Sequence, residues 1–195
     1  MSAIYTIGHS NHSALRFIDL LRGAEIECVA DVRSTPFSRR NPQFSQKALA
    51  ASLKDASIEY WFLGDALGAR PKDADCYEDG KVSYARIAAT PAFQEAIGAL
   101  IDESHAKRIA LMCAEKEPLD CHRTILVGRA LVRHGTELWH ILADGRIELR
   151  ADLEQRLLRL AKESVDLFAD RGHALARAYD KRGQQLAMPA PATSD

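Results

Sequence analysis

The sequence predicts an α/β protein: a mostly parallel sheet of about five strands with helices on both faces, followed by a C-terminal helical extension. One observation is that short apolar runs alternate with segments whose apolar residues recur every three or four positions. A second is that residues typical of turns and helix ends bound these segments, such as Gly8 after the first apolar run and Gly135 after a helical one. Such sheets bind ligands outside the carboxyl ends of their strands, so the segments that follow the strands are the places to look for chemistry.

Short apolar runs predict the strands. They lie at residues 4–7, 28–32, 58–63, 108–113 and 137–142. Asp144 and Gly145 form a hairpin signal that joins the last run to a short strand at Ile147–Leu149. Between the runs, helical spacing predicts helices, for example one at residues 122–134.

Two segments depart from this alternation. Residues 64–83 show no periodicity and contain three glycines and Pro71, so we expect a functional or mobile loop there. We divide the chain into an α/β domain at 1–150, a helical extension at 151–187 and a disordered tail at 188–195. The extension carries an apolar stripe of Leu153, Leu157, Leu160 and Phe168. We expect residues 151–169 to dock on the core and the remainder to project.

Composition excludes several classes of protein. The 26 Lys and Arg residues nearly balance the 27 Asp and Glu residues, so the whole chain lacks the cationic excess typical of non-specific nucleic-acid binders. No apolar run is long enough to span a bilayer, and the N-terminus has no secretory pattern. The 4 cysteines are too few for a disulfide framework and form no CxxC pair. We therefore expect a cytoplasmic protein with free thiols and no membrane partner.

Polar and reactive residues follow four of the predicted strands. The segments read GHSNH, DVRSTPFSRRNPQF, LGDALGARP and CAEKEPLDCHR. Because the carboxyl ends of parallel strands share one edge of the sheet, these segments predict a site at that edge.

The last of these segments is the strongest. We expect Asp120 to cap the following helix, which places Cys121, His122 and Arg123 in its first turn. The free N–H groups and the dipole of that turn favour an anion and lower the pKa of a thiol. Cys121 is therefore a candidate nucleophile, and Cys113 is another. Alternatively, Cys121 is a small packed residue and Arg123 pairs with an acidic side chain.

The other candidate residues supply proton transfer and anion binding. Glu115, His9 and Asp31 are candidate acids or bases, although structural pairing of Asp31 with Arg33 is the stronger expectation. Residues 31–47 are locally basic and broken by two prolines, which suggests an anion clamp. The candidate anion-binding residues are Arg33, Arg39, Arg40, Ser10, His122 and Arg123.

Known site patterns are mostly excluded. The cysteine–arginine spacings fit neither a tyrosine-phosphatase nor a rhodanese loop, and no Walker or GxGxxG pattern occurs. Cys113, Cys121, His122 and His9 could form a zinc-type site, but Cys-x7-Cys-His is not a standard zinc spacing. Moreover, an adjacent Cys-His pair rarely points both side chains at one ion. We therefore assign no metal ligand and no cofactor.

These motifs resemble the DUF488 family of bacterial and archaeal proteins. The resemblance covers residues 4–142 and is carried by TIGHSNH, DVRSTPFSRRNPQF, YWFLGDALGARP and LMCAEKEPLDCHR. It implies an α/β fold and supplies no reaction. The positions that match the family pattern are Gly8, His9, Ser10, Asp31, Arg33, Pro36, Ser38, Gly64, Gly68, Cys113, Glu115, Cys121, His122 and Arg123.

The leading hypothesis is an enzyme of unknown reaction class that acts on an anionic substrate, such as a nucleotide or another phosphate-bearing molecule. One alternative is a non-catalytic nucleic-acid-binding module that uses Tyr60, Trp61 and Phe62 for stacking. Another is a metal-dependent or thiol-redox protein. The expected partner is an anionic small molecule or a nucleic acid, and the sequence leaves monomer and homodimer open.

Overall fold

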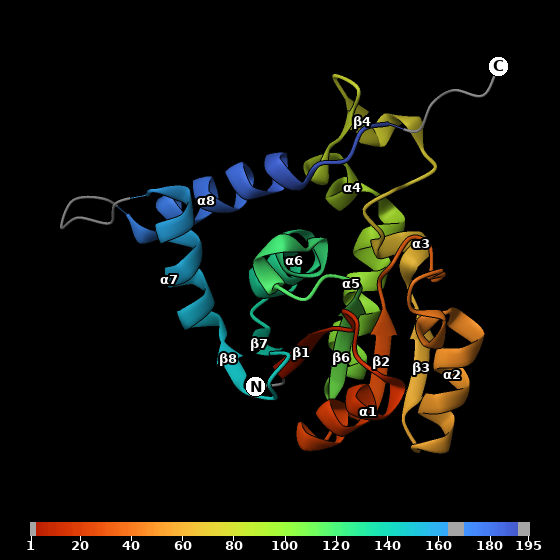
Figure 1. Cartoon of the computed structure of the whole chain (residues 1–195). Helices are drawn as coiled ribbons and strands as arrows, with labels where there is room; N and C mark the ends of the chain where they lie inside the picture. The colour runs from red at the N-terminus through yellow and green to blue at the C-terminus, as the bar shows by residue number, and fades with distance from the viewer. Residues whose placement is uncertain (1–2, 164–169, 191–195) are drawn as a thin grey trace.

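A six-stranded sheet forms the centre of the chain. The computed structural model describes residues 3–163 and 170–190 (Figure 1). The strand order is β3-β2-β6-β1-β7-β8, with the first five strands parallel and β8 antiparallel to β7. The bounds are β1 (Ala3–Gly8), β2 (Cys28–Asp31), β3 (Glu59–Phe62), β6 (Ile109–Cys113), β7 (Glu137–Ile141) and β8 (Ile147–Leu149). The expected mostly parallel α/β sheet and the terminal hairpin are therefore confirmed.

Helices cover both faces of the sheet because its central strands are apolar on both sides. In β6, Ala110 and Met112 pack with α1 (Ala14–Gly23) and α2 (Gln46–Asp55). The alternate residues of β6, which include Cys113, pack on the other side with α5 (Pro91–Glu103), η4 (Arg123–Gly128) and α6 (Arg129–Arg133). The result is three layers with the sheet in the middle (Figure 1).

The segment after β6 differs from the expected single helix. Pro118–Asp120 forms a short 3-10 turn (η3), and Cys121 is extended with φ −139° and ψ 140°. A π-helical segment, η4, follows before α6. Cys121 rather than Asp120 precedes the helix, because its carbonyl accepts from the N–H groups of Thr124 and Ile125. The expected Asp120 cap is thus wrong.

The segment at 64–83 is more ordered than expected. It contains α3 (Gly64–Leu67), η2 (Ala74–Cys76) and a two-stranded hairpin, β4 (Tyr77–Glu78) with β5 (Lys81–Val82); α4 (Tyr84–Ala89) follows it. The C-terminal segment pairs with this hairpin: Val82 N–H donates to the carbonyl of Met188, and Ala190 N–H donates to that of Gly80. Residues 188–190 are therefore ordered, contrary to expectation, whereas 191–195 lie outside the described residues.

Both helices of the C-terminal extension dock on the core. α7 (Arg150–Ala161) buries Leu153 and Leu157 as expected, but Leu160 is exposed and Leu158 is buried in its place. α8 (Arg171–Leu186) does not project, since its alanines pack against α7 and η4. Small side chains let α8 approach closely, which explains why its weak apolar pattern still marks a buried face. Phe168 of the expected stripe lies outside the described residues.

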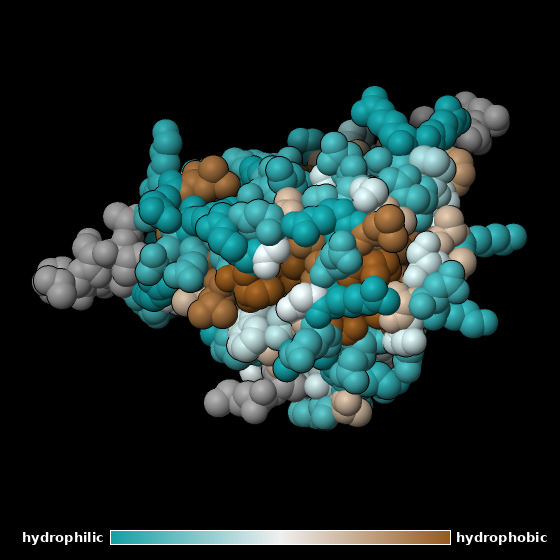
Figure 2. Space-filling view, turned by 60° about the horizontal axis from the view of Figure 1, so that its bottom comes forward, coloured by the Kyte–Doolittle hydropathy of each residue, from teal (hydrophilic) through white to brown (hydrophobic). Residues whose placement is uncertain are grey.

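One face shows a band of hydrophobic side chains among hydrophilic ones (Figure 2). In the part of the chain that the structure describes, no helix combines the length and apolar character needed to cross a membrane.

Candidate active site

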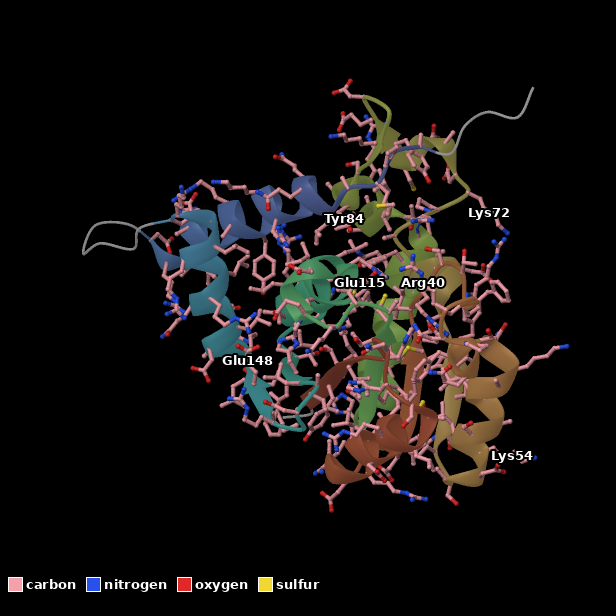
Figure 3. All side chains as sticks on the ribbon, in the orientation of Figure 1. Arg40, Lys54, Lys72, Tyr84, Glu115 and Glu148 are labelled. Atoms are coloured by element: carbon pink, nitrogen blue, oxygen red, sulfur yellow. The ribbon has the colours of Figure 1, made fainter. Side chains whose placement is uncertain are left out.

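A cavity of about 870 Å³ lies at the carboxyl ends of the parallel strands. The segments after β1, β2, β3 and β6 all contribute to its wall, together with α4 and the end of α8. Figure 3 shows three of its residues, Arg40, Tyr84 and Glu115, gathered above the strand ends. The four polar segments singled out in the sequence thus meet in one place.

Four side chains form a tight cluster at the end of β6 and the start of η4. The ligand-type atoms of Cys113, Glu115, Cys121 and His122 all lie within 4.8 Å of one another. Cys121 Sγ is 2.9 Å from Glu115 Oε2, and His122 Nδ1 is 3.7 Å from Cys113 Sγ and 3.9 Å from Cys121 Sγ. Both cysteines and the histidine are buried, whereas Glu115 faces the cavity. We call these four residues the sulfur cluster.

Close backbone approaches hold the loop that carries Glu115. A Cβ on Gly8 would lie 1.9 Å from the carbonyl oxygen of Glu115, so only glycine allows this contact. Arg123 is fully buried, and its guanidinium donates to the carbonyls of Glu115 (2.6 Å) and Lys116 (3.3 Å). Arg123 N–H also donates to Cys121 Sγ at 3.4 Å. Arg123 therefore positions the sulfur cluster and does not line the cavity.

The hydrogen bonds of His122 fix its orientation. A carbonyl oxygen can only accept, so His122 Nε2 donates to the Val32 carbonyl at 2.9 Å and Nδ1 faces the two sulfurs. Burial alone would lower the pKa of His122, but its contact with Cys121 raises that pKa above its usual value. The imidazole thus has one nitrogen anchored and one directed into the sulfur cluster.

The two thiols are electrostatically unequal. Burial and the neighbouring Cys121 raise the pKa of Cys113 well above its usual value. Burial opposes ionisation of Cys121 too, but the hydrogen bond from Cys113 and the charge of Arg123 hold its pKa well below the usual value. Burial and the proximity of Cys121 also raise the pKa of Glu115. Of the two thiols, Cys121 is therefore the more readily ionised.

A second buried group lies beside the sulfur cluster. Arg33 forms a bidentate ion pair with Asp31, through Nε to Oδ1 at 2.9 Å and Nη2 to Oδ2 at 2.6 Å. Tyr60 donates its hydroxyl to the same carboxylate at 2.8 Å. Among the described residues, three of the five guanidinium N–H donors are used, the third by His9, so two remain for a ligand.

His9 orients Arg33 and is poorly suited to proton transfer. Its Nδ1 donates to the Ser10 carbonyl at 2.9 Å, and its Nε2 accepts from Arg33 at 3.2 Å. The ring stacks on Phe44 with centroids 4.3 Å apart. Burial, assisted by the charge of Arg33, lowers the pKa of His9 to about 4. His9 is consequently neutral near pH 7, and its one lone pair is occupied.

The structure brings most candidate residues together. Those that line the cavity are His9, Ser10, Arg33, Arg39, Arg40, Cys113, Glu115 and His122. Asp31, Cys121 and Arg123 lie behind them and contact them directly. His9, considered above as a fourth zinc ligand, is not in the sulfur cluster, and Glu115 takes that position.

Sequence reasoning missed several residues of the cavity wall. Arg70 follows β3 in the LGDALGARP segment, and this position at the sheet edge could have placed it among the candidate anion-binding residues. Phe37 is 64% exposed at the cavity and lies among the basic residues that the sequence did indicate. Tyr84 had no local signal, since the return of residues 64–83 over the site depends on long-range contacts.

Comparison with known proteins yields one match. The family model described as "Domain of unknown function DUF488" matches residues 13–130, more than half of the chain. The comparisons with curated proteins and with solved structures gave no match. The matched range includes the sulfur cluster and the basic loop after β2, and begins after His9 and Ser10.

Proposed function

The chain belongs to the DUF488 family, and we propose that it is an enzyme that binds an anionic, phosphate-bearing substrate in the cavity and transforms it at the sulfur cluster. The observation that carries this proposal is that basic groups and reactive groups line the same cavity. The basic groups are Arg33, Arg39, Arg40 and Arg70, and the reactive groups are Cys113, Glu115 and His122.

The basic residues differ in accessibility. Arg39 and Arg40 are exposed on the loop after β2, where they can meet a phosphate in solution. Arg33 is almost buried but lines the cavity, and two of its guanidinium N–H donors have no partner among the described residues. Planar guanidinium groups match phosphate oxygens in pairs, which supports a phosphate-bearing ligand. The exposed ring of Phe37 beside them favours a substrate with a flat, apolar part, such as a nucleobase.

The reactive residues have distinct roles in this proposal. Glu115 accepts or donates a proton at the cavity, because it lines the cavity and because partial desolvation and the proximity of Cys121 raise its pKa. Cys113 and His122 present the sulfur cluster to the substrate, and Arg123 positions the loop of Glu115. His9 and Asp31 hold Arg33, and neither acts on a proton.

The structure weakens the argument that the aromatic residues of β3 bind nucleic acid. Tyr60 donates its hydroxyl to Asp31, and Tyr60, Trp61 and Phe62 are all partly buried in β3. These partly buried side chains therefore offer little surface on which a base could stack. Oligonucleotides nevertheless belong in the ligand panel, because Phe37 and the two exposed arginines could contact a single strand.

Ligand binding and turnover test the proposal. We would measure thermal shifts with inorganic phosphate, nucleoside mono- and triphosphates and short oligonucleotides, and follow turnover by mass spectrometry. The double variant Arg39→Ala/Arg40→Ala should bind the best ligand at least ten times more weakly, since each charged hydrogen bond contributes about 1.5–3 kcal/mol. Arg22→Ala/Arg159→Ala, which removes two exposed arginines outside the cavity, is the matched control.

Glu115→Gln separates binding from chemistry. It should retain ligand affinity within a few-fold and lose turnover, because the amide cannot carry a proton. Equal binding by the two double arginine variants would contradict the anion site. Undiminished turnover in Glu115→Gln would contradict the assigned proton transfer.

A further inference from the structure

We propose that the sulfur cluster is the binding site of a divalent cation of the zinc class, held by Cys113, Cys121 and His122 with Glu115 at the fourth, cavity-facing position. The argument for cation binding uses the geometry of the site alone, whereas a catalytic role for the bound cation rests on the proposed function.

The distances fit a tetrahedral site. Zinc–sulfur bonds of about 2.3 Å and zinc–nitrogen bonds of about 2.0–2.1 Å place neighbouring ligand atoms roughly 3.5 Å apart. His122 Nδ1 lies 3.7 Å from Cys113 Sγ and 3.9 Å from Cys121 Sγ. All four ligand atoms lie within 4.8 Å of one another. Cys121 Sγ and Glu115 Oε2 are closer, at 2.9 Å, because a thiol hydrogen bond joins them, and they must move apart when an ion replaces the thiol proton. Packing alone gives no reason for an imidazole and a carboxylate to converge on two thiols.

The surroundings of His122 match those of a metal ligand. Metal-bound histidines almost always donate their second ring nitrogen to a carboxylate or carbonyl, which aims the other nitrogen at the metal. His122 Nε2 donates to the Val32 carbonyl at 2.9 Å, so the Nδ1 lone pair points at the sulfurs. The backbone N–H of Arg123 likewise donates to a proposed ligand atom, Cys121 Sγ, and helps to hold it in place.

The charges around the site are compatible with a divalent cation. Arg123 is fully buried, and among the described residues no carboxylate pairs with it: its guanidinium donates only to two carbonyls. An uncompensated buried charge is strongly destabilising. Two thiolates, one carboxylate and one divalent cation together carry a single negative charge, which balances Arg123. The metal-bound site is therefore compatible in charge with the buried Arg123 beside it.

The local fold removes the objection raised from the sequence. Cys121 is extended and ends the loop, whereas His122 has helical backbone angles, with φ −61° and ψ −26°. This change of direction between adjacent residues lets both side chains face Cys113. Glu115 comes from the short turn between Cys113 and the η3 segment, which closes the site from the cavity side.

The donor set selects the metal class. Two sulfurs and an imidazole favour Zn²⁺ and related borderline cations over Mg²⁺ or Ca²⁺, which prefer oxygen ligands. Catalytic zinc sites use three protein ligands and keep the fourth position exchangeable. Glu115 occupies the corresponding position and is solvent-accessible. A water or a substrate oxygen can therefore replace it, after which Glu115 remains nearby to accept a proton.

Metal stoichiometry without substrate tests the site. Tag-free full-length protein should contain about one zinc per chain by elemental analysis, and the metal-free protein should bind one Co²⁺ with the absorption bands of a thiolate-ligated tetrahedral ion. Cys113→Ser, Cys121→Ser and His122→Ala should weaken Co²⁺ binding at least a hundredfold. Cys28→Ser and Cys76→Ser are matched controls, since both cysteines are buried and free but lie outside the sulfur cluster. Circular dichroism establishes that each variant is folded.

The results separate this site from the proposed function. Folded wild-type protein that binds neither Zn²⁺ nor Co²⁺ while its thiols are reduced overturns the metal site, whatever its anion affinity. Metal binding without any ligand from the anion panel overturns only the proposed function. Glu115→Gln should keep the cobalt spectrum with altered intensity; a loss of metal as complete as in Cys113→Ser overturns the exchangeable fourth position.

Discussion

Removing the charge of Asp31 should cost more stability than any single surface change. Asp31 is fully buried and accepts four hydrogen bonds, from the backbone N–H, Nε and Nη2 of Arg33 and from the hydroxyl of Tyr60. Asp31→Asn keeps the size of the side chain but leaves the Arg33 guanidinium buried without a counter-charge. It also turns an amide N–H group toward existing donors. Breaking a buried ion pair in this way typically costs about 3–5 kcal/mol.

Urea unfolding followed by tryptophan fluorescence measures this difference at pH 7. The control is Glu78→Gln, which removes an equivalent charge from the exposed pair with Arg86, whose side chains are 57% and 47% exposed. Because exposed pairs contribute little, that variant should lose less than about 1 kcal/mol. If Asp31→Asn loses no more than Glu78→Gln, the claim that this ion pair anchors Arg33 in the fold is refuted.

Three further results are expected. Burial lowers the pKa of His9 to about 4 and that of His140 to about 3, so below pH 6.5 the unfolded chain takes up protons that the folded chain refuses. Stability should fall by roughly 2–3 kcal/mol per histidine between pH 7 and 4.5, and a flat profile in urea melts would contradict this. Gly8→Ala should lower the melting temperature because its Cβ meets a backbone carbonyl, whereas Gly98→Ala, which meets nothing in α5, should not. Truncation after Arg150 removes α7 and α8 and should cause aggregation or a lower melting temperature; an unchanged melting temperature and mass by light scattering would show that these helices are dispensable.

The central strands could be predicted well because they are short apolar runs buried on both faces. The ends of the predicted runs at 4–7 and 108–113 differ from those of β1 and β6 by no more than one residue. Their parallel arrangement followed from strand–helix alternation, so the convergence of four polar segments at one edge could be expected too. Features that depend on the local pattern of apolar and polar residues could therefore be predicted from the sequence.

Features that depend on contacts between distant parts of the chain could not be predicted from the sequence. The pairing of residues 188–190 with the β4–β5 hairpin joins segments far apart in the chain. The π-helical turn at Arg123–Gly128 shares its apolar spacing with an α-helix, so nothing in the sequence separates the two. The extended conformation of Cys121, on which the geometry of the sulfur cluster depends, could not be inferred for the same reason.

The arginines of the cavity also differ in conformational entropy. An arginine side chain carries about 2 kcal/mol of rotamer freedom, and Arg33 has already lost it on folding through its bonds to Asp31 and His9. Arg39 and Arg40 are exposed and lose theirs only when a ligand arrives. Their charge reaches into solvent and speeds encounter, an effect that salt screens within about 10 Å at 0.1 M. Rising ionic strength should therefore slow association with the cavity, while the residence time of a bound anion depends mainly on the immobile donors of Arg33.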